Sequence, residues 1–85
     1  MLVDTHCHLD AAEFDTDRDA VAAAARAAGV GAIVVPAVER ANFGAVASVC
    51  RDYPGCVAAY GIHPMYVDRA REEDLAALHD VVRRE

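Results

Sequence analysis

Two histidines close to the N-terminus, His6 and His8, have the type and spacing of metal ligands. In a β-strand successive side chains point to opposite faces, so a spacing of two residues places both imidazoles on one face. Their rings can then converge on one ion at roughly 2.0 to 2.2 Å from each nitrogen. Asp4 and Asp10 fall on the same face, which an ordinary exposed strand would not require. The alternative is a pair of surface side chains, but the local pattern favours half of a metal site.

A divalent cation held in this way would suit the hydrolysis of a stable phosphodiester. Such an ion lowers the pKa of bound water from 15.7 towards about 7 and acts as a Lewis acid on a phosphoryl oxygen. The formal net charge of the chain is -6, which counts against broad electrostatic capture of nucleic acid or of an anionic membrane. Any phosphate-bearing substrate would therefore have to be held locally, through the metal.

His63 is a third candidate, because it follows an apolar run and directly precedes Pro64. From the residues alone, a functional histidine at the rim of the site and a histidine that caps a helix or locks a loop fit this position equally well. Cys7 falls on the face opposite His6 and His8, so we expect a small buried side chain there and not a ligand. His79 lies on the apolar side of a predicted helix, where we expect packing.

The length of 85 residues allows one small domain with a single core. Its three cysteines form no C-x-x-C pair, which indicates reduced thiols and not a disulfide framework or a cysteine-rich zinc module. No basic leader precedes Asp4, and every apolar run is far too short to span a bilayer. We therefore expect a cytoplasmic protein with no membrane segment and no evident obligate protein partner.

Hydrophobic patterning predicts strands and helices in alternation. Segment 31–36 is a continuous β-branched run, as expected for a strand covered on both faces in a parallel sheet. Thr16 is the expected N-cap of the first helix and Asn42 that of the second. In the third helix Leu75, Leu78, His79 and Val82 are expected to share the apolar face. In chain order we predict strands at 3–10, 31–36 and 56–62, and helices at 17–28, 43–52 and 72–84.

This βαβαβα order implies parallel strands joined by right-handed crossovers. Each βα unit recurs at about 25 to 30 residues, which suits an open doubly wound sheet or the first three eighths of a (β/α)8 barrel. A dinucleotide-binding loop is not predicted, because the glycines at 29–31 precede a strand and do not follow one.

Several motifs, in order along the whole chain, resemble the N-terminal part of the TatD family. The matching segments are DTHCHLD at 4–10, FD at 14–15, RD at 18–19, AGV at 28–30, YP at 53–54 and GIHP at 61–64. The D-x-H-x-H element alone would not identify the family, since polymerase-and-histidinol-phosphatase (PHP) domains and amidohydrolases such as dihydroorotases open similarly. The set of motifs in this order is specific.

The resemblance implies an α/β fold, the TIM barrel of a metal-dependent hydrolase, typically a deoxyribonuclease with a divalent metal at the carboxyl ends of the strands. The metal would be Mg, Mn or Zn, and the substrate would be DNA or another phosphodiester held locally through the metal. By the same resemblance, His6 and His8 match the first two metal ligands. His63 matches the histidine of the GxHP motif, a catalytic residue in contact with substrate or with the ligands, and Asp4 matches a position that orients the ligands.

The other ligands of the family include a glutamate after the fourth strand, further histidines and an aspartate late in the barrel, and none has a counterpart here. Glu72, Glu73 and Glu85 fall on the third predicted helix, which faces outward in such a barrel. We therefore expect residues 1–85 to be a truncated N-terminal fragment, the first three units of the barrel, that is inactive alone. The alternatives are a PHP-type phosphoesterase or cyclic amidohydrolase on a similar barrel, or a non-catalytic metal-binding fragment.

Overall fold

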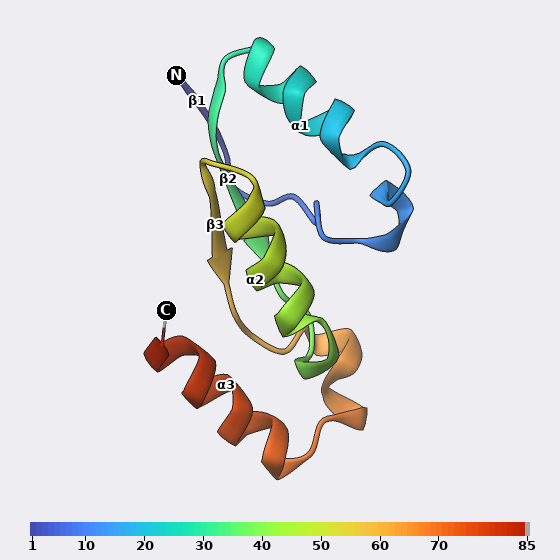
Figure 1. Ribbon diagram of the computed structural model, residues 1–85. Coiled ribbons are helices and arrows are strands. Elements are labelled where there is room, and N and C mark those ends of the chain that lie inside the picture. Colours follow the sequence, from blue (N-terminus) through green and yellow to red (C-terminus); the bar gives the residue numbers. More distant parts are fainter. Residues whose placement is uncertain (85) are drawn as a thin grey trace.

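Three parallel strands, β1 (Leu2–Asp4), β2 (Val30–Pro36) and β3 (Cys56–Ala59), form one sheet in chain order (Figure 1). The structure is a computed structural model that describes residues 1–84. β2 is the central strand and pairs with both neighbours. Since parallel neighbours need a crossover, each connection contains a helix, and right-handed crossovers between strands in this order place the helices on one face.

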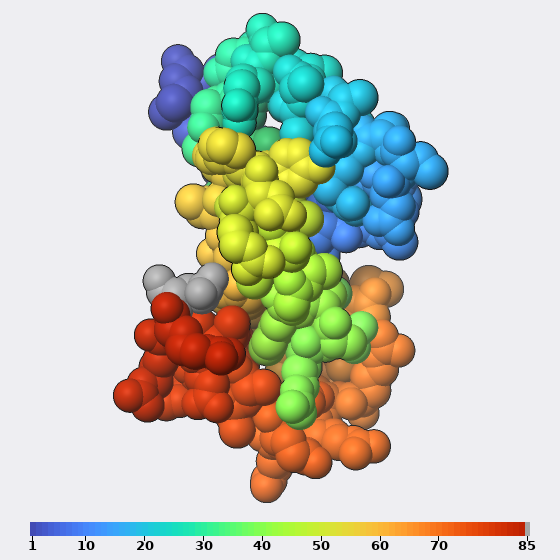
Figure 2. All heavy atoms as spheres, in the orientation of Figure 1, coloured from blue at the N-terminus to red at the C-terminus, as the bar shows by residue number. Residues whose placement is uncertain are grey.

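The helices follow the strands in turn, so the predicted βαβαβα order is confirmed. They are α1 (Arg18–Ala27), α2 (Phe43–Asp52) and α3 (Glu72–Arg84), with short 3₁₀ turns η1 (Ala12–Phe14), η2 (Arg40–Asn42) and η3 (Pro64–Arg69) before them. Figure 2 shows the helical side of the molecule, with α2 between α1 and α3. The turn into β3 requires glycine, because Gly55 has a φ of +90° and a Cβ there would lie 2.6 Å from the Gly31 carbonyl oxygen.

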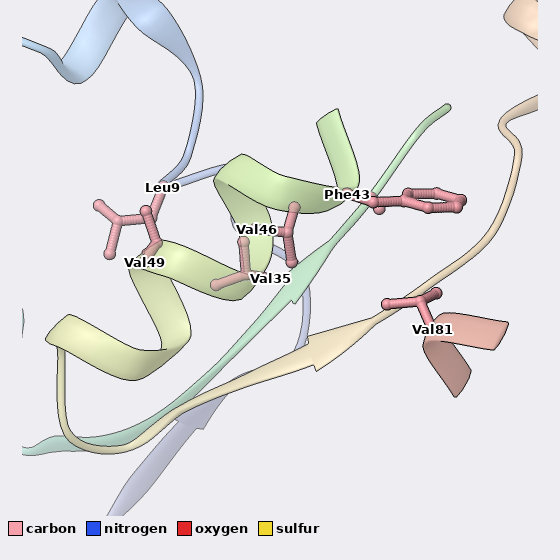
Figure 3. Close-up of a cluster of buried hydrophobic side chains, with 7 residues drawn as sticks. Leu9, Val35, Phe43, Val46, Val49 and Val81 are labelled. Atoms are coloured by element: carbon pink, nitrogen blue, oxygen red, sulfur yellow. The ribbon is translucent and has the colours of Figure 1, made fainter. Parts of the chain in front are cut away.

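The core lies between α2 and the sheet (Figure 3). Val35 of β2 and Val46 of α2 are fully buried, and Leu9, from the loop after β1, is 1% exposed. The buried apolar residues are Leu9, Val35, Ala37, Phe43, Val46, Val49 and Val81. The loop that carries the candidate ligands is therefore anchored directly in the core, one residue after His8.

Two polar contacts tie α1 to the turn between α2 and β3. The Tyr53 hydroxyl donates to a carboxylate oxygen of Asp19, and the Arg26 guanidinium donates to the Pro54 carbonyl oxygen at 2.9 Å. The hydrogen bond to Asp19 is the main reason that the pKa of Tyr53 is raised, because the carboxylate favours the protonated phenol. These contacts lie at the end of the sheet opposite the carboxyl ends of the strands.

Several predicted boundaries are wrong. The first strand was predicted to reach Asp10, but β1 ends at Asp4. β3 ends at Ala59 and not at residue 62. α1 begins at Arg18 with Asp17 at its N-cap position, so Thr16 does not cap it. The Asp4 side chain explains the first difference, since it accepts from the His6 backbone N–H and turns the chain.

The apolar face predicted for the third helix is confirmed only at Leu78, which is half-buried and packs against the core cluster. Val81 is the buried residue of α3, whereas Leu75 and Val82 are more than half exposed. His79 does not pack, because its side chain is 68% exposed and lies beside Asp80. Val81 packs in the core cluster, and Asp74, about two helical turns before it, pairs with Arg40 at 3.3 Å. These two contacts set the rotation of the helix.

Glu85, predicted at the end of the third helix, lies outside the described residues. Glu72 and Glu73 are on α3 as predicted, and both are exposed. Among the described helices, none combines the length and the apolar character that crossing a bilayer requires.

Candidate metal centre

The candidate site lies at the carboxyl ends of the parallel strands. His6 and His8 follow the end of β1, and His63 follows the end of β3. The His63 backbone N–H donates to the Val38 carbonyl oxygen at 2.7 Å, which joins the segment after β3 to the segment after β2. The loops at this end of a parallel sheet are where α/β proteins place their active sites.

The imidazoles of His6 and His8 face each other. Their Nε2 atoms are 3.1 Å apart, and their ring centroids are 4.8 Å apart with the ring planes at 89°. An ion held tetrahedrally at about 2.1 Å from each nitrogen would keep the two nitrogens roughly 3.4 Å apart, so a small adjustment admits one. The predicted convergence of the rings is confirmed, although both residues lie in a loop and not on a strand.

Asp4 shapes this loop from the end of β1. Its Oδ1 accepts from the His6 backbone N–H at 3.1 Å, an interaction between residues two apart that bends the chain directly after the strand. Cys7 returns to the sheet, because its N–H donates to the Val34 carbonyl oxygen at 3.1 Å. The histidines on either side of Cys7 therefore lie on the same side of the loop, away from the core that receives Leu9.

Cys7 is partly buried and packs against the core cluster, in agreement with the prediction of a small packed side chain. Burial, together with the nearby carboxylates of Asp4 and Asp10, raises the pKa of the Cys7 thiol.

The potential nitrogen donors that converge at this site are two imidazoles. Within residues 1–84, no group of three or more histidine, cysteine, aspartate or glutamate side chains could hold an ion. Asp10 is close in sequence, but its Oδ2 accepts from Asn42 Nδ2 at 3.0 Å and its Oδ1 is buried without a partner among the described residues. Two imidazoles fit a cation that accepts nitrogen ligands, such as zinc, provided that further groups complete its coordination.

His63 caps a helical turn. Its Nδ1 accepts from the Met65 backbone N–H at 3.1 Å at the start of η3, and its ring meets the Tyr66 ring at 6.3 Å between centroids. The Arg69 guanidinium lies over the Tyr66 ring at 4.7 Å from its centroid. Of the two alternatives given for His63 from the sequence, the histidine that caps a helix is therefore observed. A neutral imidazole that accepts at Nδ1 carries its proton on Nε2, which leaves Nε2–H as a donor.

Capping does not remove His63 from the site. Its side chain and that of His8 line one open cavity of about 490 Å³, between the loops that follow the strands. The polar lining residues are His8, Asp10, Glu13, Asn42, His63 and Tyr66. The structure thus brings His8 and His63 to one hollow, whereas Asp4 and His6 are not among the residues that line it.

The motifs and this geometry agree with the comparisons to known proteins. The model of the family described as TatD related DNase matches residues 3–85. The chain belongs to the TatD family. The TatD homologue YjjV from Escherichia coli K12 has a crystal structure that superposes with a TM-score of 0.91 and 37% identity, over 99% of this chain and 32% of that one.

Other TatD relatives carry names that describe an activity. Human deoxyribonuclease TATDN3 is 40% identical over 65 residues, which are 75% of this chain and 24% of that protein. The 3'-5' ssDNA/RNA exonuclease TatD of Cronobacter turicensis is 30% identical over 77 residues, 91% of this chain and 29% of that protein. The chain spans about a third or less of the length of these TatD proteins.

The TatD fold assignment is confirmed. Three parallel strands with alternating helices superpose on the YjjV structure, so the chain has the architecture of the first three units of a (β/α)8 barrel. This resolves the choice between a barrel and a doubly wound sheet, which the sequence pattern left open.

Two residues at this TatD site were missed by the sequence analysis. Arg18 binds the backbone of the loop after His8, and Asn42 binds the Asp10 side chain. Asn42 was expected only as a helix cap, but its Oδ1 accepts from the backbone N–H groups of Val38 and Glu39. Neither partner could be found from periodicity, because the contacts join separate segments of the chain.

Substitution can separate two contacts of the His63 side chain, the cap of η3 and the packing against the Tyr66 ring. We expect His63→Ala to lose about 1 kcal/mol of stability, because the cap of η3 is removed, and His63→Asn to lose only a few tenths, because asparagine is a good N-cap. Urea unfolding followed by circular dichroism measures both. Equal losses in the two variants would show that the imidazole packs against Tyr66 more than it caps.

Proposed function

We propose that the protein acts as a metal-dependent hydrolase that cleaves phosphodiester bonds in DNA, with residues 1–85 as the N-terminal part of its barrel. The observation that carries this proposal is the 3.1 Å approach of two imidazole Nε2 atoms at the carboxyl ends of the strands. The names of the TatD relatives support the class of reaction and of substrate. Leu2, Val3 and Val57 of the two edge strands are more than half exposed, an apolar surface that the rest of a barrel would cover.

We infer that the bound ion is zinc or a similar nitrogen-accepting cation. Imidazole suits zinc, whereas magnesium prefers an octahedral set of oxygen ligands, and the two candidate ligands are nitrogens. When bound, the cation supplies Lewis-acid stabilisation of the charge that develops on the phosphate and activates water for attack. His6 and His8 would hold it, and Asp4 would keep His6 in place through the backbone.

The residues that line the cavity orient the substrate. Asp10 and Glu13 line it and, among the described residues, no arginine or lysine does, so an anionic phosphate is disfavoured inside. We infer that the phosphate lies at the histidine pair and that an uncharged part of the nucleotide, its sugar or base, enters the cavity. His63 Nε2–H is then placed to donate to an oxygen of the substrate.

Two imidazoles do not complete a four-coordinate shell, so further ligands must come from outside the described residues. We therefore propose that the 85-residue chain binds the metal weakly and hydrolyses DNA far more slowly than a complete barrel. Single-stranded DNA incubated with the chain and Mg²⁺, Mn²⁺ or Zn²⁺, with and without a chelator, measures this. Fast, chelator-sensitive cleavage by the chain alone would contradict the need for further ligands.

A chimeric protein tests the proposed function itself. Residues 1–85 replace the matching segment of the Cronobacter exonuclease TatD, whose other two thirds supply what this chain lacks. We expect this chimera to cleave single-stranded DNA in a chelator-sensitive manner, and a His6→Ala, His8→Ala chimera to lose the activity. A folded wild-type chimera without cleavage would refute the proposal, and hydrolysis of a cyclic amide in its place would move the protein to another reaction class.

A further inference from the structure

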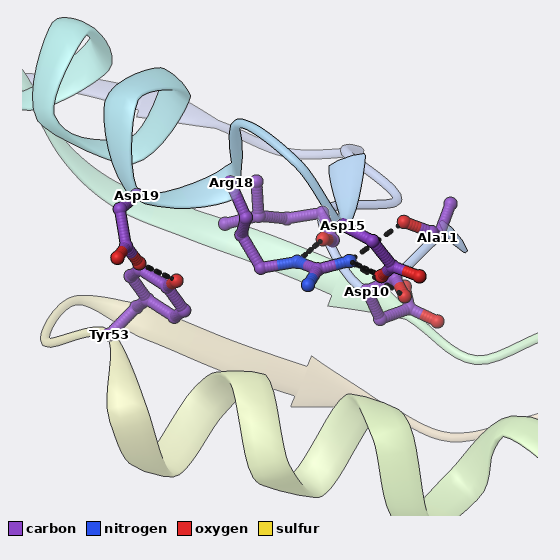
Figure 4. Close-up of polar contacts among 7 residues, drawn as sticks. Asp10, Ala11, Asp15, Arg18, Asp19 and Tyr53 are labelled. Carbon is purple, nitrogen blue, oxygen red and sulfur yellow. Dashed lines mark hydrogen bonds and ion pairs between the residues drawn. The ribbon is translucent and has the colours of Figure 1, made fainter. Parts of the chain in front are cut away.

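Arg18, the first residue of α1, reaches back to the loop that carries His8 (Figure 4). Its Nε donates to the Leu9 carbonyl oxygen at 2.7 Å, and its NH2 nitrogen donates to the Ala11 carbonyl oxygen at 2.8 Å. A longer contact of 3.4 Å reaches the carbonyl oxygen of Asp10. One guanidinium thus donates hydrogen bonds to the carbonyl oxygens of three consecutive residues.

The surroundings of Arg18 make these bonds strong. Its side chain is only 18% exposed, so competition from water is limited, and Asp15 accepts a further hydrogen bond at 2.9 Å that also neutralises the charge. Carbonyls in a loop have no helix or strand partners, and an arginine provides five donors in a rigid fork. The guanidinium therefore supplies hydrogen bonds that the Leu9 and Asp10 carbonyls do not receive from a helix or a strand.

The segment after His8 is held from three directions. The Leu9 side chain is buried in the core, the Asp10 side chain accepts from Asn42, and the carbonyls accept from Arg18. His6, in contrast, is exposed and depends on the Asp4 carboxylate at its backbone N–H. The position of the His8 imidazole relative to the His6 ring is therefore set by the anchored loop on its C-terminal side.

We propose that Arg18 is a positioning residue for the histidine pair: it fixes the turn at Leu9, Asp10 and Ala11 so that the His8 ring stays directed at His6. Its link to metal rests on the proposed function. Its effect on the loop does not, because the contacts exist within the chain itself. Removing the guanidinium frees the Leu9 and Asp10 carbonyls and leaves the Ala11 carbonyl with the Phe14 N–H alone, so the loop can sample other conformations that would weaken an ion held by both rings.

Arg26 provides a matched control on the same helix. It also donates to a backbone carbonyl oxygen, that of Pro54 at 2.9 Å, but at the opposite end of the sheet. Arg18→Met and Arg26→Met each remove one guanidinium and keep an unbranched apolar stem. Arg18→Lys keeps the charge without the fork and serves as the milder variant if Arg18→Met does not unfold cooperatively.

Two readouts on the 85-residue chain test the proposal. The first is amide hydrogen exchange at Ala11, whose N–H donates to the His8 carbonyl oxygen at 3.0 Å, compared with Ala37, whose N–H donates to Ala59 at 2.8 Å. We expect Arg18→Met to lower protection at Ala11 by about tenfold or more relative to Ala37, and Arg26→Met to change neither selectively. The second is Zn²⁺ affinity, which we expect to fall by about 10- to 100-fold in Arg18→Met only.

The outcomes separate this inference from the proposed function. Unchanged protection of Ala11 in Arg18→Met, or an equal loss in Arg26→Met, overturns the positioning role. Failure of the wild-type chain to bind Zn²⁺, together with the selective loss of protection at Ala11, contradicts the weak metal binding proposed for the chain and leaves the positioning of the loop supported. Loss of Zn²⁺ affinity without any change in exchange overturns the inference too, because the effect would then not pass through the loop.

Discussion

We expect the replacement of His6 and His8 by alanine to abolish Zn²⁺ binding by the chain. This is the largest functional effect that we expect, because the two Nε2 atoms are 3.1 Å apart and no group of three or more potential ligands occurs within the described residues. Loss of a residue that only hydrogen-bonds to a ligand costs roughly 10- to 100-fold in metal affinity, and loss of both ligands costs more. Competition with a chromophoric chelator measures the affinity in both proteins.

His79→Ala is the matched control for this prediction. It removes one imidazole from the exposed side of α3, where the side chain is 68% exposed and Asp80 lies at 4.0 Å. We expect no change in Zn²⁺ affinity. If the double variant and the wild type bind equally well, the ion is held elsewhere and the candidate centre is wrong. Single His6→Ala and His8→Ala variants should each resemble the double variant, since one imidazole alone holds an ion weakly.

The parts of the fold that could be predicted are those set by neighbouring residues. The β-branched run 31–36 became the central strand β2, and the alternation of strands and helices followed from local patterns. The convergence of His6 and His8 was predicted from strand geometry, yet the structure achieves it in a loop. The spacing of two residues was informative, because it keeps side chains on one side in an extended chain whether or not the chain is paired in a sheet.

The parts that could not be predicted depend on distant residues or on side chains that compete with the backbone. β1 ends early because an aspartate side chain competes with the sheet for the His6 N–H. The rotation of α3 is set in part by an ion pair between Arg40 and Asp74, which are 34 residues apart. The loop contacts of Arg18 and Asn42 likewise join separate elements, and periodicity contains no information about them. The sequence therefore predicts the candidate ligands and their convergence, but not the contacts that hold them in position.

Leu9→Ala is expected to leave most of the chain unfolded at 25 °C. Leu9 is 1% exposed and belongs to a cluster of seven buried apolar residues within the described part of the chain. Truncating a buried leucine costs about 2 to 5 kcal/mol, whereas a single core in a chain of this size rarely supplies more than roughly 3 to 5 kcal/mol. Urea unfolding followed by circular dichroism gives the free energy of unfolding of each variant.

Two controls separate burial from side-chain size. Leu9→Met keeps the volume and should cost less than about 1.5 kcal/mol. Val57→Ala removes methyl groups from a residue that is 52% exposed, so its cost should be small. Because Leu9 follows His8 directly, Leu9→Met should also keep the Zn²⁺ affinity of the chain. A Leu9→Ala variant within about 1 kcal/mol of the wild type would mean that the loop can leave the core without unfolding it. The histidine pair would then be positioned by Arg18 and Asn42 and not by the core.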